Sequence, residues 1–521
     1  MGTTLTGSFR IPQGKLSSGD NAIGVRAVDT AGNTSTVSNL HYYLDTSPSR
    51  SDFTVTDLSV REYYGKAVLS WNAAAASSDV KVSVHRGTSA NFTPSASTLA
   101  AENISGTNWI DSSCVTGTVY YKVVSEALTG SWVNDPLISA AVQYTSPLSS
   151  GSFTNRTGNR EYLPYYDFTA PMGEGTVEES SGNLLYSQED YSLTNDHFSY
   201  GLTRTYNSRD VRSGMLGRGW SDSYHRELYK SGNDIYFIDT DGSCYLFEKV
   251  NGSYSCAETK DYTLTAAGSG YTLEDKDHIV TTFNDFGQMT EQREPNGCSL
   301  RFVYSPNGTI SSVISNTGLT EARVLALTYD TTNPYLLSVI DLFDESQLEY
   351  TITSGKLTKV RHKKGNDHID WDYSYDGSGN MTSLTDGEEN AYSFAWSNGK
   401  VSTLTYPDLE SAQFTYGNGT TSVTGKTPGN DTLYTMSAGF DTSTGKVTSE
   451  TGKDGQTTQY DYNAPNPYLV TAEKTTVYYQ SLSGNTVSFQ SHASVNEIAY
   501  TYDSDENIRG DLRWRGHRLH V

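Results

Sequence analysis

The sequence predicts an all-β protein built from short antiparallel strands. Of its 521 residues, 38 are Tyr and 12% are aromatic, and aromatic side chains favour strands because their rings pack well on a pleated surface. Among the 46 glycines are repeated Asn-Gly and Asp-Gly steps, which adopt positive φ and mark tight hairpin turns. A chain of this length is expected to form about three or four domains.

The charge balance excludes several kinds of partner. The net charge is −23, from 37 basic and 60 acidic side chains. Such a field repels phosphate backbones and anionic membranes, so we expect no nucleic-acid partner. The sequence has no run of 18 apolar residues, and we therefore expect no membrane span. The polar residues after Met1 do not resemble an export signal, and we interpret the chain as a fragment that begins inside a longer protein.

The four cysteines do not form a disulfide framework. Cys244 and Cys256 flank a predicted hairpin turn at Asn251-Gly252. A two-residue turn at that point places Cys256 opposite Phe247, which leaves Cys244 on the other face of the sheet. A disulfide between these two cysteines is therefore disfavoured.

Two segments at the start of the chain are predicted to be the C-terminal part of one small sandwich domain and the whole of a second. Residues 1–46 contain an alternating strand and the turn-forming stretch Asp29–Asn33, which resemble the closing hairpin of a bacterial Ig-like domain. Residues 53–145 place Trp71 on one strand and Tyr121 on a later one, which resembles a fibronectin type III domain. That resemblance implies that Trp71 is the core Trp and Tyr121 the corner tyrosine. No Arg-Gly-Asp occurs within residues 53–145, so a spacer role is favoured over adhesion.

Residues 146–166 are rich in Ser, Gly and Asn and are predicted to be a linker. Behind them, over residues 167–260, four motifs follow one another: Gly182–Tyr186, Leu202–Arg209, Gly214–Ser221 and Tyr236–Ser243. In this order they resemble the domain that opens the repeat region of bacterial Rhs proteins. We call residues 167–260 the opening region.

Residues 261–510 repeat a pattern of an aromatic residue, a turn and a hydrophobic residue at intervals of about 20 residues, which is typical of stacked hairpins. Examples are Phe283–Thr290, Tyr375–Thr382 and Phe440–Thr448. The pattern resembles the YD repeat of Rhs proteins, wall-associated proteins and teneurins. We expect Asp-x-x-Gly to form the turn, the next hydrophobic residue to enter a strand, and the Tyr to stack on the preceding unit.

The resemblance implies a fold and a function. The fold is Ig-like and fibronectin III sandwich domains followed by a spiralling antiparallel YD-repeat sheet, a partial Rhs shell. The function is that of a non-catalytic structural part of a secreted or cell-surface protein, extracellular or wall-associated, used for toxin encapsulation, toxin delivery or cell–cell contact. The partner would be a C-terminal toxin cargo, which these residues lack, or cell-surface glycans.

The last residues depart from the repeat pattern. Glu506 stands where the unit Tyr375–Met381 has its turn glycine, and residues 511–521 form an atypical basic tail. The Asp-Pro-x-Gly-Leu element of the Rhs core is missing. Our hypothesis is that the repeat pattern ends here through truncation or frameshift of a longer gene.

A search for reactive constellations assigns no catalytic, cofactor or metal residue. The ten histidines are scattered, and His362 and His368 are expected to be exposed rather than to bind a metal. Asp239–Gly242 resembles the start of a calcium loop, but Val250 stands where the final Glu ligand is required, which favours a hairpin turn.

Acidic clusters and tryptophans leave two further alternatives. The pairs Asp367/Asp370 and Glu388/Glu389 could serve a glycosidase, but 60 carboxylates make such pairs common by chance. Trp371 and Trp396 could stack on sugar rings, although a core position in the repeats is favoured. A carbohydrate-binding adhesin and a polysaccharide-degrading enzyme therefore remain as alternative functions, the enzyme being the weaker because no segment after residue 167 is left for a catalytic domain.

Overall fold

The computed structural model describes residues 16, 19–44, 49–73, 79–153, 157–170, 173–194, 199–317, 321–342, 344–462, 466–483, 486–504, 506 and 508–517. Within them the chain is all β, as predicted, with antiparallel sheets, three short 3₁₀ turns and no α-helix. The 3₁₀ turns are η1 (Arg50–Phe53), η2 (Gly130–Trp132) and η3 (Ser150–Phe153). No described helix is long and apolar enough to cross a membrane.

The chain divides into two compact units, described separately below. The first holds residues 1–60, 69–109 and 118–144, and the second holds residues 61–68, 110–117 and 145–521. Two short segments near the start of the chain, residues 61–68 and 110–117, thus belong to the second unit.

The first unit contains a hairpin and most of two small sheets. The hairpin is β1 (Gly19–Val25) with β2 (Ser38–Leu44). One sheet has the order β3-β4-β7, with β3 (Val55–Tyr63), β4 (Lys66–Ala73) and β7 (Asn108–Asp111). The other has the order β10-β8-β5-β6, with β9 also paired to β8: β5 (Val80–Gly87), β6 (Leu99–Glu102), β8 (Thr118–Ala127), β9 (Leu137–Ile138) and β10 (Val142–Thr145).

The side chains chosen from the sequence as core residues of this region are buried. Trp71 on β4 is 4% exposed and Tyr121 on β8 is fully buried. The turn at Asp29–Asn33 also forms, because the Gly32 amide donates to the Asp29 carbonyl at 3.0 Å. The assignment of these residues to Ig-like and fibronectin III domains stays a prediction.

The opening region forms two of the three sheets of the second unit. A five-stranded sheet has the order β11-β12-β13-β14-β17: β11 (Tyr165–Ala170), β12 (Gly173–Glu178), β13 (Asn183–Thr194), β14 (Ser199–Asn207) and β17 (Trp220–Asp222). A four-stranded sheet has the order β18-β19-β20-β21: β18 (Glu227–Ser231), β19 (Asp234–Ile238), β20 (Cys244–Val250) and β21 (Ser253–Cys256).

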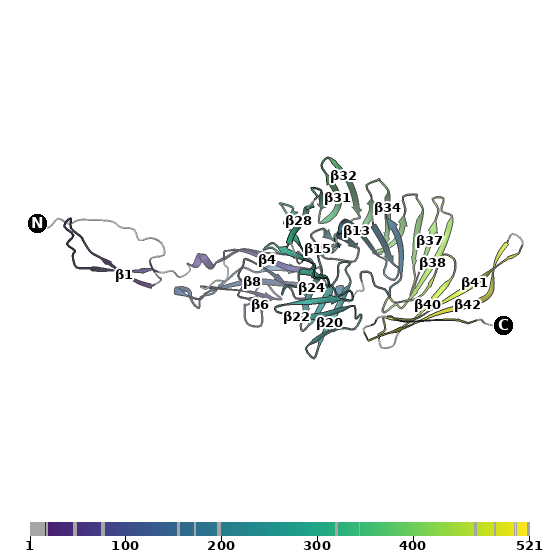
Figure 1. The fold of residues 1–521 in the computed structure, drawn as a ribbon, viewed down its shortest axis with the longest axis horizontal. Coiled ribbons are helices and arrows are strands. Elements are labelled where there is room, and N and C mark those ends of the chain that lie inside the picture. Colours follow the sequence, from purple (N-terminus) through teal and green to yellow (C-terminus); the bar gives the residue numbers. More distant parts are fainter. Residues whose placement is uncertain are drawn as a thin grey trace. The chain divides into compact units, whose positions relative to one another are not determined.

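The third sheet contains 24 described strands, and Figure 1 shows its consecutive hairpins side by side. It starts with β15 (Ser213–Gly214) and β16 (Gly217–Arg218) and then follows chain order from β22 to β43. The strands are β22 (Tyr262–Ala267), β23 (Gly270–Asp275), β24 (Val280–Phe283), β25 (Met289–Arg293), β26 (Ser299–Tyr304), β27 (Ile310–Asn316), β28 (Glu321–Tyr329), β29 (Leu337–Leu342), β30 (Gln347–Thr353), β31 (Lys356–Lys364), β32 (Asp367–Tyr375), β33 (Met381–Thr385), β34 (Ala391–Ser397), β35 (Lys400–Thr405), β36 (Ser411–Tyr416), β37 (Thr420–Lys426), β38 (Thr432–Phe440), β39 (Val447–Thr451), β40 (Thr457–Tyr462), β41 (Val470–Ser483), β42 (Thr486–Tyr502) and β43 (Ile508–His517). We call β22–β43 the repeat sheet.

The main core of the second unit lies between the five-stranded sheet and one face of the repeat sheet. Phe168 on β11 lies 5.9 Å from Phe394 on β34, measured between ring centroids. Trp220 on β17 lies 5.1 Å from Tyr373 on β32. The repeat strands present hydrophobic residues on this face. The opening region covers them, and they would otherwise be exposed to water.

Part of the segment predicted to be a linker packs against the opening region. Leu148 and Phe153 pack in a small cluster with Tyr229, Ile238 and Cys244. Leu148 and Phe153 lie outside the described strands, and tertiary contacts bury them.

The predicted turns have the expected geometry. Val250 pairs with Ser253 around Asn251-Gly252, and Phe247 lies opposite Cys256, as the register argument requires. All four cysteines are free. Asp239–Gly242 is a hairpin turn, in which the Gly242 amide donates to the Asp239 carbonyl at 3.0 Å.

The end of the described chain continues the sheet. Glu506 has a φ of +66°, the conformation that glycine adopts in other repeat turns. Residues 508–517 then form β43, which pairs with β42. An Arg-Gly-Asp sequence occurs here, at residues 509–511, on a strand.

Candidate functional site

The repeat turns share one hydrogen-bonding design. In the unit beginning at Tyr375, the Asp376 carboxylate accepts the amides of Ser378 and Asn380, each at 2.9 Å, and Gly379 takes a φ of +95°. Asn284 accepts the amides of Phe286 and Gln288 in the same way, both at 3.0 Å. The Asx side chain therefore replaces backbone partners that the turn cannot provide.

The aromatic residue at the end of a unit reaches back to an earlier one. The Tyr416 hydroxyl donates to the Val401 carbonyl at 2.6 Å, and the Tyr462 hydroxyl donates to the Val447 carbonyl at 2.6 Å. In each case the acceptor is the carbonyl of the first or second residue of an earlier strand. The same bond joins five further pairs: Tyr304 to Met289, Tyr329 to Ile310, Tyr375 to Leu357, Trp396 to Met381 and Tyr502 to Val470. We call this series the aromatic ladder. It confirms the predicted contact with the preceding unit and identifies its chemistry.

A lysine covers the ring at several of these steps. Lys400 lies 4.5 Å from the Tyr416 ring centroid and Lys446 lies 4.7 Å from that of Tyr462. Each lysine immediately precedes the residue whose carbonyl accepts the bond. Sequence reasoning missed this role, although the recurrence of Gly-Lys followed by Leu or Val, at residues 355–357, 399–401 and 445–447, was a usable signal.

The opening region is joined to the repeat sheet by a fully buried polar cluster around Arg204. The Arg204 Nε donates to both carboxylate oxygens of Asp190 at 2.8 Å, and its Nη2 donates to the Gln188 side-chain oxygen at 2.7 Å. The repeat sheet completes the cluster, since the Tyr350 hydroxyl donates to Asp190 at 3.0 Å and the Tyr373 hydroxyl donates to Gln188 at 3.1 Å. We call these five residues the Arg204 cluster.

The electrostatics of the Arg204 cluster are those of a structural ion pair. The side chains of Arg204 and Asp190 are both 0% exposed. Burial tends to lower the pKa of Arg204, but the Asp190 carboxylate outweighs it and raises that pKa, so the guanidinium stays charged. Burial also raises the pKa of the Tyr350 and Tyr373 hydroxyls well above 10, which keeps them protonated as donors. The guanidinium lies 5.1 Å from the ring centroids of both Trp220 and Tyr373.

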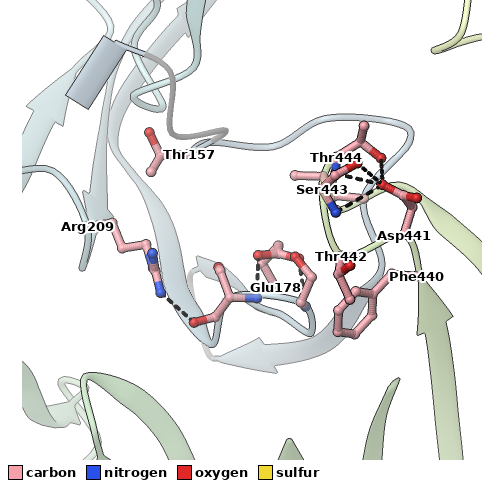
Figure 2. Close-up of a pocket in the computed structure, with 12 residues that line it drawn as sticks. Thr157, Glu178, Arg209, Phe440, Asp441, Thr442, Ser443 and Thr444 are labelled. Carbon is pink, nitrogen blue, oxygen red and sulfur yellow. Dashed lines mark hydrogen bonds between the residues drawn. The ribbon is translucent and has the colours of Figure 1, made fainter. Parts of the chain in front are cut away.

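A surface cleft lies beside the opening region, between the turn after β12 and the turn after β38 (Figure 2). It encloses about 250 Å³. Its carboxylates are already occupied: Glu178 accepts the amides of Ser180 and Ser181 at 2.7 and 2.9 Å, and Asp441 accepts the amide of Thr444 at 2.8 Å. These groups hold turns in place, so the cleft offers neither carboxylate as a free reactive group.

The histidine and acidic candidates from the sequence do not converge on a reactive site. His362 and His368 lie on neighbouring strands, β31 and β32, and are not placed opposite each other. Among the described residues, no group of three or more His, Cys, Asp or Glu is placed to hold a metal. Asp370 is engaged by Arg361 and Lys359, and Arg361 holds its pKa well below the usual range. A permanently ionised, paired carboxylate is a poor general acid.

The tryptophan candidates lie in the repeat core. Trp371 is 4% exposed. Trp396 is partly buried against the main core, and its indole N–H donates to the Met381 carbonyl at 2.7 Å. The core interpretation of these two residues is therefore confirmed.

One family model matches part of the opening region, and several known proteins resemble part of the chain. Residues 175–247 match a family described as "Domain of unknown function (DUF6531)". The chain is 27% identical over 151 residues to the tRNA nuclease WapA of Bacillus subtilis (strain 168), which covers 29% of this chain and 6% of that protein. It is 26% identical over 155 residues to the probable deoxyribonuclease RhsA of Dickeya dadantii, covering 27% of this chain and 10% of that protein. The chain thus matches only a small part of these relatives.

Solved structures give a weaker likeness. A TcdB2-TccC3 structure without its hypervariable C-terminal region matches 85% of this chain and 31% of its own, at 9% identity and a TM-score of 0.27. The Photorhabdus luminescens Tc holotoxin pore matches 77% of this chain and 26% of its own, at 11% identity and a TM-score of 0.30.

Proposed function

We propose that this chain is a non-catalytic structural part of a secreted or cell-surface Rhs-type protein. In this role the opening region and the repeat sheet form the start of a β-shell that serves to enclose or deliver a toxin cargo carried elsewhere in the protein. The residues before the opening region would form Ig-like and fibronectin III spacers that hold the shell away from the cell surface.

The Arg204 cluster carries this proposal. Arg204 belongs to the Leu202–Arg209 motif and donates to Asp190 and Gln188 on β13. Asp190 and Gln188 in turn accept the hydroxyls of two repeat residues, Tyr350 on β30 and Tyr373 on β32. The motif is thus used to fix the repeat sheet to the opening region rather than to present a reactive group. The relatives named as nucleases are matched over only 6–10% of their length. The nuclease activity in their names can therefore belong to the unmatched parts of those proteins.

Purified chain tests the non-catalytic part of the proposal. Incubated with tRNA and with plasmid DNA, it is expected to cleave neither above the level of a heat-denatured sample. Cleavage that one Asp or Glu substitution abolishes would show instead that the chain is an enzyme.

A competition assay tests the structural role. In the source bacterium, removing the codons for residues 167–510 in frame should abolish toxicity toward neighbouring cells. Arg204→Met should reduce toxicity strongly, whereas Arg361→Met, which breaks a partly exposed pair, should not. Full toxicity without residues 167–510 would refute the proposal. A glycan array with the intact chain decides the alternative, because saturable binding to one glycan class would favour the adhesin.

A further inference from the structure

The tip of the β3–β4 hairpin is a separate buried feature of the second unit. It consists of residues 61–68, which belong to that unit although the rest of the hairpin does not. Tyr63, Tyr64 and Lys66 are 4%, 2% and 3% exposed. Buried Tyr and Lys at a hairpin turn are unusual, because such turns normally face water.

The backbone of the tip is held by the start of the 24-stranded sheet. The Tyr64 amide donates to the Ser213 carbonyl at 2.8 Å, and the Ser213 amide donates to the Glu62 carboxylate at 3.1 Å. The Tyr64 residue has a φ of +47° and Gly65 one of +77°, so the turn is a tight one. A Cβ on Gly65 would lie 2.8 Å from the Leu148 side chain, which leaves no room for a larger residue.

Tyr64 fills a polar niche beside β17. Its hydroxyl donates to Asp222 at 2.9 Å and accepts the Met215 amide at 3.3 Å. Its ring stacks on the His225 imidazole with centroids 4.1 Å apart and an interplanar angle of 18°. The His225 ring in turn contacts Asp222 through Nδ1 at 2.8 Å.

Lys66 joins the opening region to the repeat turn at residues 284–288. Its ammonium group pairs with Glu227 and donates to the carbonyls of Phe286 and Gly287 at 2.8 and 3.2 Å. All three ammonium protons thus have a partner, and the side chains of Lys66 and Glu227 are 2% and 4% exposed. The Gly287 carbonyl also accepts the Leu228 amide at 2.9 Å, so the same turn is tied to β18.

We propose that the second unit carries a docking site for a β-hairpin tip and that residues 61–68 are its occupant. The site is formed by residues 213–215, 222–229 and 286–287, and it recognises a tyrosine at the turn and a lysine two residues later. Docking locks the opening region onto the repeat turn at residues 284–288. This inference does not depend on the proposed shell function.

Hydrogen exchange on the intact chain tests the proposal. In Lys66→Met, the amides of peptides covering residues 226–231 and 284–289 should exchange at least about tenfold faster, because Glu227 is left buried without its countercharge. The turn at residues 376–380 has the same internal bonds and no contact with Lys66, so its exchange should change by less than about twofold. Lys81→Met is the matched control, since Lys81 and its partner Glu102 are 35% and 48% exposed.

A milder variant keeps the proposal testable if Lys66→Met does not fold. Tyr64→Phe removes only the hydroxyl bonds to Asp222 and Met215 and keeps the stacking on His225. It should accelerate exchange in peptides covering residues 213–218 and 222–231 by about threefold or more. Unchanged exchange in both variants, or a uniform increase that includes residues 376–380, would overturn the proposal.

Discussion

Arg204→Met should be one of the most destabilising single substitutions in the second unit. Methionine fills a similar volume, but it leaves the Asp190 carboxylate buried with only the Tyr350 hydroxyl, 3.0 Å away, as a remaining partner in the cluster. Breaking a buried ion pair by removing one partner costs about 3–5 kcal/mol, whereas a partly exposed pair contributes about 1 kcal/mol or less. The free energy of unfolding should therefore fall by about 3–5 kcal/mol.

The second substitution Asp190→Asn should restore most of that loss. The double variant has no buried charge, and replacing both partners of a buried pair is often close to neutral. Urea unfolding at pH 7, followed by near-UV circular dichroism and by hydrogen exchange in peptides from β13 and β14, measures both variants. Arg361→Met is the control, since Arg361 and Asp370 are 34% and 21% exposed. A loss below about 1 kcal/mol for Arg204→Met would refute the view that the buried pair stabilises the cluster to which the repeat sheet is hydrogen-bonded.

Three further outcomes follow from the geometry. Tyr416→Phe should lower the free energy of unfolding by about 0.5–1.5 kcal/mol in urea denaturation, because the Val401 carbonyl loses its donor. Burial raises the pKa of Glu62 to about 7 and that of Glu179 to about 8. The folded chain therefore keeps these two carboxyl groups protonated at pH values above about 4.5, where the unfolded chain releases the protons. The stability contributed by these groups is present below pH 4.5 and lost as the pH rises through 7 to 8, and unfolding monitored from pH 5 to 9 should show this decline. Burial raises the pKa of the Cys244 thiol to about 12, so iodoacetamide at pH 8 should label it slowly in the folded chain and rapidly in urea, as followed by mass spectrometry.

The first two outcomes are checked with variants, and the third with the unmodified chain. Tyr120→Phe removes an exposed hydroxyl contact to Gln143, 3.2 Å away, and should change stability by less than about 0.5 kcal/mol. Glu179→Gln should flatten the pH dependence, and an unchanged slope in that variant would contradict the assignment. Rapid labelling of Cys244 without denaturant would show that the small core around it opens readily.

The sequence alone determined the features that depend on local spacing. Asn251-Gly252 specified a two-residue turn, and the register that follows placed Cys256 opposite Phe247. The Asp-x-x-Gly spacing specified the repeat turns, and Glu506 was identified correctly as a residue in a glycine position. These predictions succeed because turn type and strand alternation are set within a few residues.

The partners of the buried charges could not be predicted in the same way. Tyr350 and Tyr373, which bond the partners of Arg204, lie 146 and 169 residues after Arg204, and nothing in local periodicity joins them to the cluster. Lys66 lies 161 residues before Glu227, in a segment that the sequence assigns to a different domain. Such pairings depend on how whole sheets stack, because a buried charge is tolerated only where several distant elements supply its partners together.

The sequence by itself therefore determined that this protein is all β, where its repeat turns lie and which motifs mark the opening region. Only the tertiary structure decided that the Leu202–Arg209 motif binds the repeat sheet and that a hairpin tip from residues 61–68 completes the second unit. The physical reason is that turns and strand faces are local properties of the chain, whereas only the folded sheets bring Tyr350 and Tyr373 to the Arg204 cluster and Glu227 to Lys66, within hydrogen-bonding distance of the buried groups that they satisfy.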